Sequence, residues 1–90
     1  MTQFEFDPVK DAANLKAHGV SLSVAQELDW DSALVWVDKR FQYDEERMIG
    51  LAPRGEILFY VAFVDRGETR RIISLRQATR GEAKHYVQSN

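Results

Sequence analysis

The chain has 90 residues and a formal net charge of −2, with 44% hydrophobic and 29% charged residues. This length predicts a single domain over 1–90 with a small core, and the composition excludes an intrinsically disordered chain. Because there is no cysteine, a disulfide framework, a thiolate zinc site and a cysteine nucleophile are excluded. No apolar run approaches the roughly 20 residues of a membrane-spanning helix, and residues 1–10 lack a signal-peptide core. We therefore expect a cytoplasmic protein.

The N-terminal third of the chain predicts a short strand followed by two helices. Residues 4–6 alternate in polarity, as edge strands do. Asp7 can cap a helix that begins at Pro8 and ends at His18–Gly19, with Gly19 as a left-handed cap. The apolar residues along one side of this helix are Val9, Ala12, Ala13 and Leu15. A second helix is expected over about 21–30.

The rest of the chain predicts a sheet and a last helix. Residues 57–64 are eight apolar or aromatic residues in a row, which is typical of a strand buried on both faces. Further strands are expected at 33–37, 47–51 and 69–76, with a polar loop over 38–44. Thr79 and Glu82 have the spacing of a capping box, so a helix over 80–88 should follow. The pattern predicts an α+β domain: an antiparallel β-sheet of about four strands with two N-terminal helices and one C-terminal helix.

Charged residues are segregated along the chain. Acidic residues dominate 27–46, whereas basic residues dominate 66–84. A polyanion could bind the basic side, although two ordinary solvated faces explain the segregation equally well. The two histidines lack metal-ligand spacing and the five glycines form no phosphate-binding loop, so neither a metal nor a cofactor is expected.

Arginines on the predicted sheet are the main candidates for chemistry. Cleaving RNA without a metal requires a base for the 2′-OH proton, an acid for the leaving oxygen and cations for the phosphorane charge. Arginine suits this last role because its planar guanidinium matches two phosphate oxygens. Alternation along a regular last strand places Arg70, Ser74 and Arg76 on one face and Arg71 on the other. Arg47, on the strand before the hairpin, could lie close to either group.

Each candidate also has a structural interpretation. His18 can act as an acid or a base near neutral pH, but it equally favours a helix C-terminus electrostatically. Lys16 can contact phosphate. Arg71 could instead pair with a carboxylate such as Glu46, and Arg76 could cap the edge of the sheet. These alternatives stay open at the level of the sequence.

Several short motifs occur in order along nearly the whole chain. Residues 4–10 read F-E-F-D-P-V-K and residues 71–76 read R-I-I-S-L-R. They resemble F-E-W-D-P-x-K and R-I-I-S-A-R of the BrnT family, bacterial type II toxins that are small ribonucleases grouped by fold with RelE-like toxins. Further matching positions are Asn14, His18, Gly19, Val20, Glu46, Arg47, Ile49, Gly50, Ala78, Thr79, Glu82 and Tyr86. The family lysine before the histidine is Ala17 here, with Lys16 one place earlier.

The resemblance implies a growth-inhibiting toxin that cleaves RNA without a metal and halts translation. It also implies a BrnA-type antitoxin, a ribbon-helix-helix protein that would cover the toxin in a hetero-oligomer able to bind operator DNA. Carried over onto matching positions, the catalytic residues would be His18, Arg47, Arg71 and Arg76. The further candidates for RNA phosphate contacts are Lys16, Arg70, Ser74 and Arg80.

The resemblance also suggests roles for these residues. Arg71 and Arg76 would contact the scissile phosphate with support from Arg47, and His18 or Glu46 would transfer protons. Because Arg71 and Arg76 are five residues apart, they can serve one site only if the strand is bulged or the site wraps its edge. Two other classes of function stay open: a catalytically inactive interaction module or co-repressor partner with the same fold, and an RNA-binding protein that does not cleave.

Overall fold

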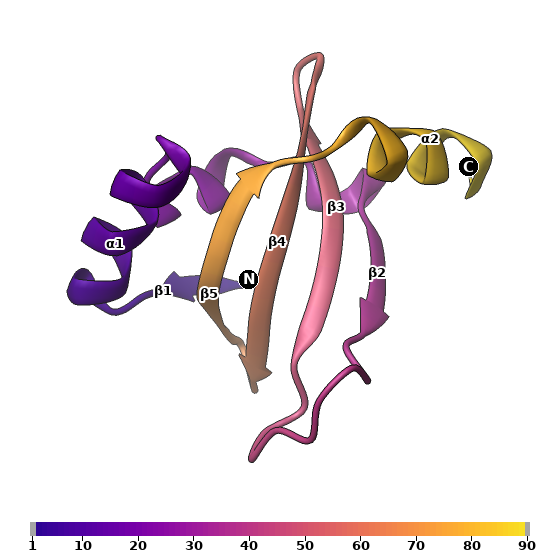
Figure 1. Ribbon diagram of the computed structural model, residues 1–90. Coiled ribbons are helices and arrows are strands. Elements are labelled where there is room, and N and C mark those ends of the chain that lie inside the picture. Colours follow the sequence, from indigo (N-terminus) through magenta and orange to yellow (C-terminus); the bar gives the residue numbers. More distant parts are fainter. Residues whose placement is uncertain (1, 90) are drawn as a thin grey trace.

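The computed structural model describes residues 2–89 as an α+β fold around one five-stranded mixed sheet (Figure 1). The order of the strands across the sheet is β1-β5-β4-β3-β2. In chain order the elements are β1 (Gln3–Glu5), α1 (Pro8–His18), the 3-10 helices η1 (Leu22–Glu27) and η2 (Trp30–Ser32), β2 (Leu34–Val37), β3 (Met48–Arg54), β4 (Ile57–Arg66), β5 (Thr69–Gln77) and α2 (Arg80–Ser89).

The sheet differs from the prediction in strand number and in the direction of one pair. The expected antiparallel sheet of about four strands is confirmed in part. The edge strand expected at 4–6 is present as β1, but it brings the sheet to five strands and pairs with β5 in parallel, Gln3 opposite Thr69. The other three pairs are antiparallel, as predicted. A parallel pair needs a crossover connection. Here α1, the two 3-10 helices and β2 to β4 all lie between β1 and β5 in the chain.

Local capping chemistry determines both ends of α1 and the start of α2, as predicted. The Asp7 carboxylate accepts a hydrogen bond from the Val9 N–H at 2.9 Å, and Gly19 takes the left-handed conformation with φ of 74°. At α2 the capping box is complete, since the Thr79 N–H donates to Glu82 Oε1 at 2.8 Å and the Glu82 N–H donates to Thr79 Oγ1 at 3.2 Å. The second predicted helix is instead the pair of short 3-10 helices.

One face of the sheet, called here the core face, holds the main hydrophobic core. Its buried cluster consists of Leu22, Ala25, Leu28, Ala52, Phe59, Val61, Phe63, Ile72 and Leu75. Trp30 closes the cluster: its ring lies 5.3 Å from Phe63 and 5.9 Å from Phe4, and its Nε1–H donates to the Ala25 carbonyl at 2.8 Å. The predicted burial of the apolar run 57–64 on both faces is confirmed only for 61–64, because Ile57 at its start is exposed and Leu58 and Tyr60 are partly exposed.

The first helix packs against the sheet through a polar side chain. Asn14 is 6% exposed, whereas Val9 and Leu15, on the side predicted to be apolar, are 77% and 53% exposed. The Asn14 side-chain amide donates to the carbonyls of Leu75 at 2.8 Å and Val20 at 2.9 Å, and its oxygen accepts from the Leu75 N–H at 3.1 Å. Asn14 therefore satisfies the edge of β5 beyond the end of β1, and Figure 1 shows α1 beside that edge.

A register shift in β5 determines which side chains share a face. Ala62 lies opposite Ser74 and Phe63 lies opposite Ile72, so Ile73 has no opposing residue. Such an extra residue is a β-bulge, and it reverses the alternation of the side chains that follow it.

Candidate functional site

The bulge in β5 brings the two outer arginines of the R-I-I-S-L-R motif to the same face. Arg71 lies opposite Val64, Ser74 opposite Ala62, and Arg76 opposite Tyr60. Directly paired residues project to the same side. We call this side, lined by Tyr60, Ala62, Val64, Arg71, Ser74 and Arg76, the arginine face. The predicted grouping of Arg70 with Ser74 and Arg76 is wrong, because that grouping assumed a regular strand.

Arg70 belongs to the core face instead. It lies opposite Asp65, to which it donates two hydrogen bonds at 2.7 and 2.9 Å. Its guanidinium covers the rings of Trp30 and Phe63 at 4.5 and 4.4 Å from their centroids. The structure thus separates Arg70 from the other candidate phosphate contacts and gives it a packing role.

The two arginines of the arginine face are paired with carboxylates. Arg71 donates to Glu5 at 3.3 Å, so its partner is on β1 and the predicted pairing with Glu46 is wrong. Arg76 donates to both oxygens of Glu82 at 2.8 and 2.9 Å, and its guanidinium lies 4.0 Å from the centroid of the Tyr60 ring. This pairing lowers the pKa of Glu82 and raises that of Arg76. Glu82 therefore links the N-terminus of α2 to the arginine face.

Arg47 differs from these arginines because it has no carboxylate partner among the described residues. It directly precedes β3, and its Nε atom is buried without a hydrogen-bond partner in residues 2–89. Its guanidinium lies 4.1 Å from the centroid of the Tyr43 ring, a favourable cation–π contact. A buried donor without a partner lowers the stability of the fold, and an anion that accepted its hydrogen bond would remove this cost. Arg47 is therefore the arginine here best suited to bind an anion.

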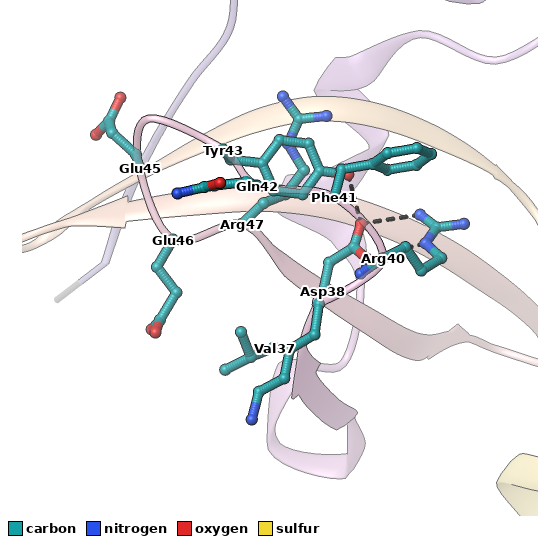
Figure 2. Close-up of a pocket in the computed structure, with 10 residues that line it drawn as sticks. Val37, Asp38, Arg40, Phe41, Gln42, Tyr43, Glu45, Glu46 and Arg47 are labelled. Atoms are coloured by element: carbon teal, nitrogen blue, oxygen red, sulfur yellow. Dashed lines mark hydrogen bonds and ion pairs between the residues drawn. The ribbon is translucent and has the colours of Figure 1, made fainter.

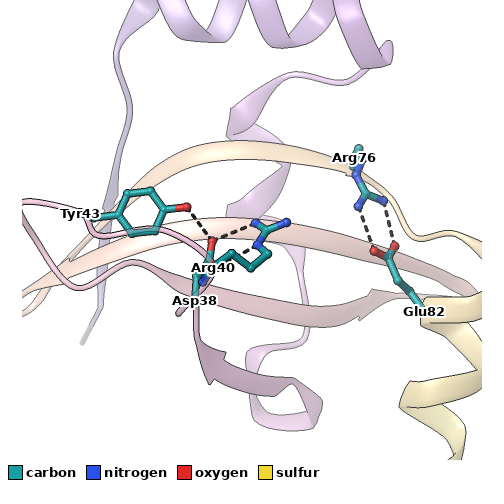
Figure 3. Close-up of polar contacts among 5 residues, drawn as sticks. All are labelled: Asp38, Arg40, Tyr43, Arg76 and Glu82. Atoms are coloured by element: carbon teal, nitrogen blue, oxygen red, sulfur yellow. Dashed lines mark hydrogen bonds and ion pairs between the residues drawn. The ribbon is translucent and has the colours of Figure 1, made fainter.

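The loop 38–47, which joins β2 to β3, is organised around the buried carboxylate of Asp38. Asp38 accepts from Nε and Nη2 of Arg40 at 2.9 Å each and from the Tyr43 hydroxyl at 2.9 Å (Figure 3). The hydrogen bond from the Arg40 side chain is the main reason that the pKa of Asp38 is far below its ordinary value, although burial opposes it. Burial, with the hydrogen bond to Asp38, raises the pKa of Tyr43, so its hydroxyl stays protonated. This network fixes the Tyr43 ring beside Arg47.

Two adjoining hollows open at this loop. One, of about 560 Å³, is lined by residues 37–43 and 45–47, and Figure 2 shows the side chains around it. The other, of about 400 Å³, lies between the loop, α1 and the sheet. Its basic lining residues are Lys10, Arg47, Arg66 and Arg71. Arg66 is paired with Glu45, whereas Lys10 has no ion pair among the described residues. Asp44 and Glu45 line this hollow too. An anion there would meet Lys10 and Arg47, and also Arg71 if it exchanged Glu5 for the anion.

The remaining sequence-predicted residues lie outside these hollows. His18 and Lys16 are exposed on the last turn of α1, and no described hydrogen bond or ion pair joins either to an arginine. Lys16 follows Val9 by two helical turns, so the two side chains lie on the same solvent-exposed side of α1, which we call the outward stripe. Arg80 is exposed at the start of α2. Ser74 lies on the arginine face, between Arg71 and Arg76 in the chain.

Four residues of these hollows were not predicted from the sequence: Lys10, Asp38, Arg40 and Tyr43. Lys10 was visible as the last residue of the F-E-F-D-P-V-K motif, and its place two turns before Ala17 puts both on one stripe of α1. The other three lie in a polar loop, where no periodicity shows which side chains meet. Only their contacts around Asp38 reveal them.

The comparison with known families decides the identity of the chain. Residues 6–82 match the family described as "Ribonuclease toxin, BrnT, of type II toxin-antitoxin system". The chain belongs to the BrnT family. No curated protein gives a significant match to it.

Two structural observations accompany membership of the BrnT family. Among residues 2–89 there is no cluster of three or more His, Asp or Glu side chains arranged to hold a metal ion. No helix in the same range is long and apolar enough to cross a membrane. The BrnT family is one of ribonuclease toxins, and the feature of this chain suited to a polyanionic substrate is the arginine face with its adjoining loop.

Proposed function

We propose that this BrnT chain is the toxin of a type II toxin–antitoxin system and an endoribonuclease that cleaves RNA without a metal in the cytoplasm, thereby halting translation and growth. The bulge at Ile73 is the observation that carries the proposal. It puts Arg71 and Arg76 on one face. Arg47 directly precedes β3, and its buried Nε–H has no hydrogen-bond partner among the described residues. Three guanidinium groups around one surface match the charge of a phosphorane.

The arginines would act through charge that develops in the transition state. The scissile phosphate would bind Arg47 first, since that side chain has no competing carboxylate among the described residues. Arg71 and Arg76 would exchange Glu5 and Glu82 for phosphoryl oxygens as the 2′-oxygen attacks phosphorus and the charge on those oxygens rises. The interactions then strengthen in the transition state, as catalysis requires.

Proton transfer needs one group to take the 2′-OH proton and another to protonate the 5′-oxygen that leaves. Glu46 is better placed than His18 for the first step, because it lines the same hollow as Arg47, whereas His18 lines neither hollow. Tyr43 is unsuited to act as a base, since its raised pKa keeps its hydroxyl protonated. The products would be a 2′,3′-cyclic phosphate and a 5′-hydroxyl end.

The partner of such a toxin would be a BrnA-type antitoxin with a ribbon-helix-helix DNA-binding fold. The pairing of Glu5 with Arg71 and of Glu82 with Arg76 supports inhibition by carboxylates that compete with RNA for these arginines. An antitoxin that covers this face would exclude RNA. The hetero-oligomer would bind operator DNA through the antitoxin.

Induced expression in bacterial cells tests the proposal. Wild type should arrest growth and cut RNA, whereas Arg47→Ala, Arg71→Ala and Arg76→Ala should relieve both effects. Arg54→Ala is the matched control: Arg54 ends β3 at the hairpin and pairs with Glu27 at 2.9 Å, away from the arginine face. Harmless wild-type protein with intact RNA, or arginine variants as toxic as wild type, would contradict the proposal.

The carboxylate pairing of two arginines favours a second candidate function. If Glu5 and Glu82 hold Arg71 and Arg76 permanently, the face can recognise a partner but cannot cleave RNA. The chain would then be an inactive interaction module or co-repressor partner. Purified protein that binds the antitoxin but leaves RNA intact, even after Glu82→Gln frees Arg76, would support this alternative.

A further inference from the structure

The loop beside the arginine face presents an aromatic ring that the fold does not use. Phe41 is 67% exposed, the largest exposed fraction of any aromatic side chain among residues 2–89. Its only described ring contacts are edge-on to Tyr43 at 6.1 Å and with the Arg40 guanidinium at 6.0 Å. A ring this exposed contributes little to the core, so its place on the loop calls for a different explanation.

The loop holds Phe41 in a defined position despite this exposure. Asp38 accepts from the Arg40 side chain and backbone N–H, and from the Tyr43 hydroxyl, so the residues on both sides of Phe41 are tied to one buried carboxylate. Figure 2 shows Phe41 beside Tyr43 and above Arg40, next to the hollow that Arg47 also lines. The hollow has a volume of about 560 Å³, within the range that holds small organic groups.

The charges around Phe41 favour a nucleic acid over a protein as the occupant. Arg40 and Asp38 neutralise each other, and Glu45 is paired with Arg66. The free charges of the hollow are then Lys39 and Arg47 against Glu46. The centre of a protein–protein interface is depleted of charged residues, whereas most of the residues that line this hollow beside Phe41 are charged. A single ring beside cations is instead the arrangement that binds a base and the adjacent phosphate.

We propose that Phe41 is a stacking platform for an unpaired RNA base next to the scissile phosphate, and that the substrate of this protein is therefore single-stranded RNA. The inference rests on the proposed function, because it assigns the phosphate to Arg47. In a duplex every base is paired and covered by its neighbours, so no base face is available to the ring. In a single strand, a base can stack on Phe41 while its phosphate reaches Arg47.

Binding measured by fluorescence anisotropy tests this assignment. The probe is a short fluorescent RNA of unstructured sequence with 2′-O-methyl riboses, which cannot be cleaved through the 2′-oxygen, alone or annealed to its complement. Phe41→Ala and Phe41→Leu should each weaken binding of the single strand by about tenfold, since leucine has no π-face. Phe41→Trp should bind as tightly as wild type. Ile57→Ala, at an exposed apolar residue of the hairpin, should change nothing.

Salt dependence separates stacking from charge. The slope of log Kd against log salt should be unchanged in Phe41→Ala and should fall by about 0.7 in Arg47→Ala, since one phosphate contact is lost. Equal affinity of wild type for the single strand and the duplex, or Phe41→Leu equal to wild type, would overturn the proposal. So would unchanged RNA affinity in the Phe41 variants with loss of binding to a co-expressed antitoxin, which would assign the ring to a protein contact.

Cleavage of unmodified RNA by the same proteins keeps this test distinct from that of the proposed function. If RNA stays intact but the single strand binds in a Phe41-dependent manner, the ribonuclease proposal fails and the stacking assignment stands. If wild type and Phe41→Ala cleave equally well, the ribonuclease proposal stands and the stacking assignment is wrong.

Discussion

Replacement of Asn14 by aspartate is a sharp test of how α1 is attached to the sheet. The two side chains have nearly the same shape, but aspartate lacks the amide donors that Asn14 directs to the carbonyls of Val20 and Leu75 at 2.9 and 2.8 Å. Asn14→Asp keeps the acceptor for the Leu75 N–H. The change therefore removes two hydrogen bonds and places a carboxylate against two carbonyl oxygens in a site that is 6% exposed.

The expected loss of stability follows from these two carbonyl acceptors, of which that of Leu75 is buried and that of Val20 is partly buried. Each buried polar group left without a partner costs about 1–3 kcal/mol, so Asn14→Asp should lower the free energy of unfolding by about 2–4 kcal/mol. For a domain of this size, that corresponds to a fall in Tm of roughly 10–30 °C. Thermal unfolding followed by circular dichroism at pH 7 measures it. Leu15→Asp adds the same carboxylate one residue later, at a position 53% exposed, and should cost only about 0.5–1 kcal/mol.

The difference in stability between Asn14→Asp and wild type should depend on pH. Burial next to carbonyl oxygens raises the pKa of the new carboxyl, and its protonated form can donate one of the lost hydrogen bonds. The stability deficit should therefore shrink as the pH falls through that raised pKa. A Tm within about 3 °C of wild type at pH 7 would refute the reasoning that Asn14 holds α1 to β5.

Three further predictions concern packing, the acid range and the site. Gly50→Ala should lower the free energy of unfolding by about 1–3 kcal/mol in urea titration, because a Cβ there would lie 3.2 Å from Val61 Cγ1 and 3.6 Å from Trp30; unchanged stability would contradict this close packing. Glu82→Gln keeps the capping geometry but removes the negative charge that pairs with Arg76, so it should cost about 1 kcal/mol at pH 7. Because the hydrogen bonds from Arg76 lower the pKa of Glu82 in the folded state, that difference should be lost as the pH falls through the lowered pKa. A pH-independent difference would argue against the ion pair. Ala17→Lys places a cation on the same side of α1 as Lys10 and should steepen the salt dependence of RNA binding. Val9→Lys adds the same charge on the outward stripe and should have a smaller effect, so equal effects would contradict the assigned faces.

Features that depend on residues close together in the chain could be predicted from the sequence. The Asp7–Pro8 start of α1, the left-handed Gly19 and the capping box of Thr79 and Glu82 are all confirmed. The strand at 57–64 is confirmed as well, although its burial on both faces is limited to 61–64. Capping hydrogen bonds and backbone preferences operate within about four residues, and a run of apolar residues favours burial wherever it lies in the fold.

The composition of the arginine face, in contrast, was decided only by the tertiary structure. The sequence supplies Arg71 and Arg76, but Ile73 must be left without an opposing residue before they share a face. That register depends on Ile72 and Leu75 both packing in the core face, a requirement set by β4 and the helices rather than by β5 itself. The contacts of Asp38 with Arg40 and Tyr43, and the parallel pairing of β1, likewise depend on long-range packing. The periodicity of the side chains within one strand cannot reveal a shift of register that the neighbouring strand and helices impose.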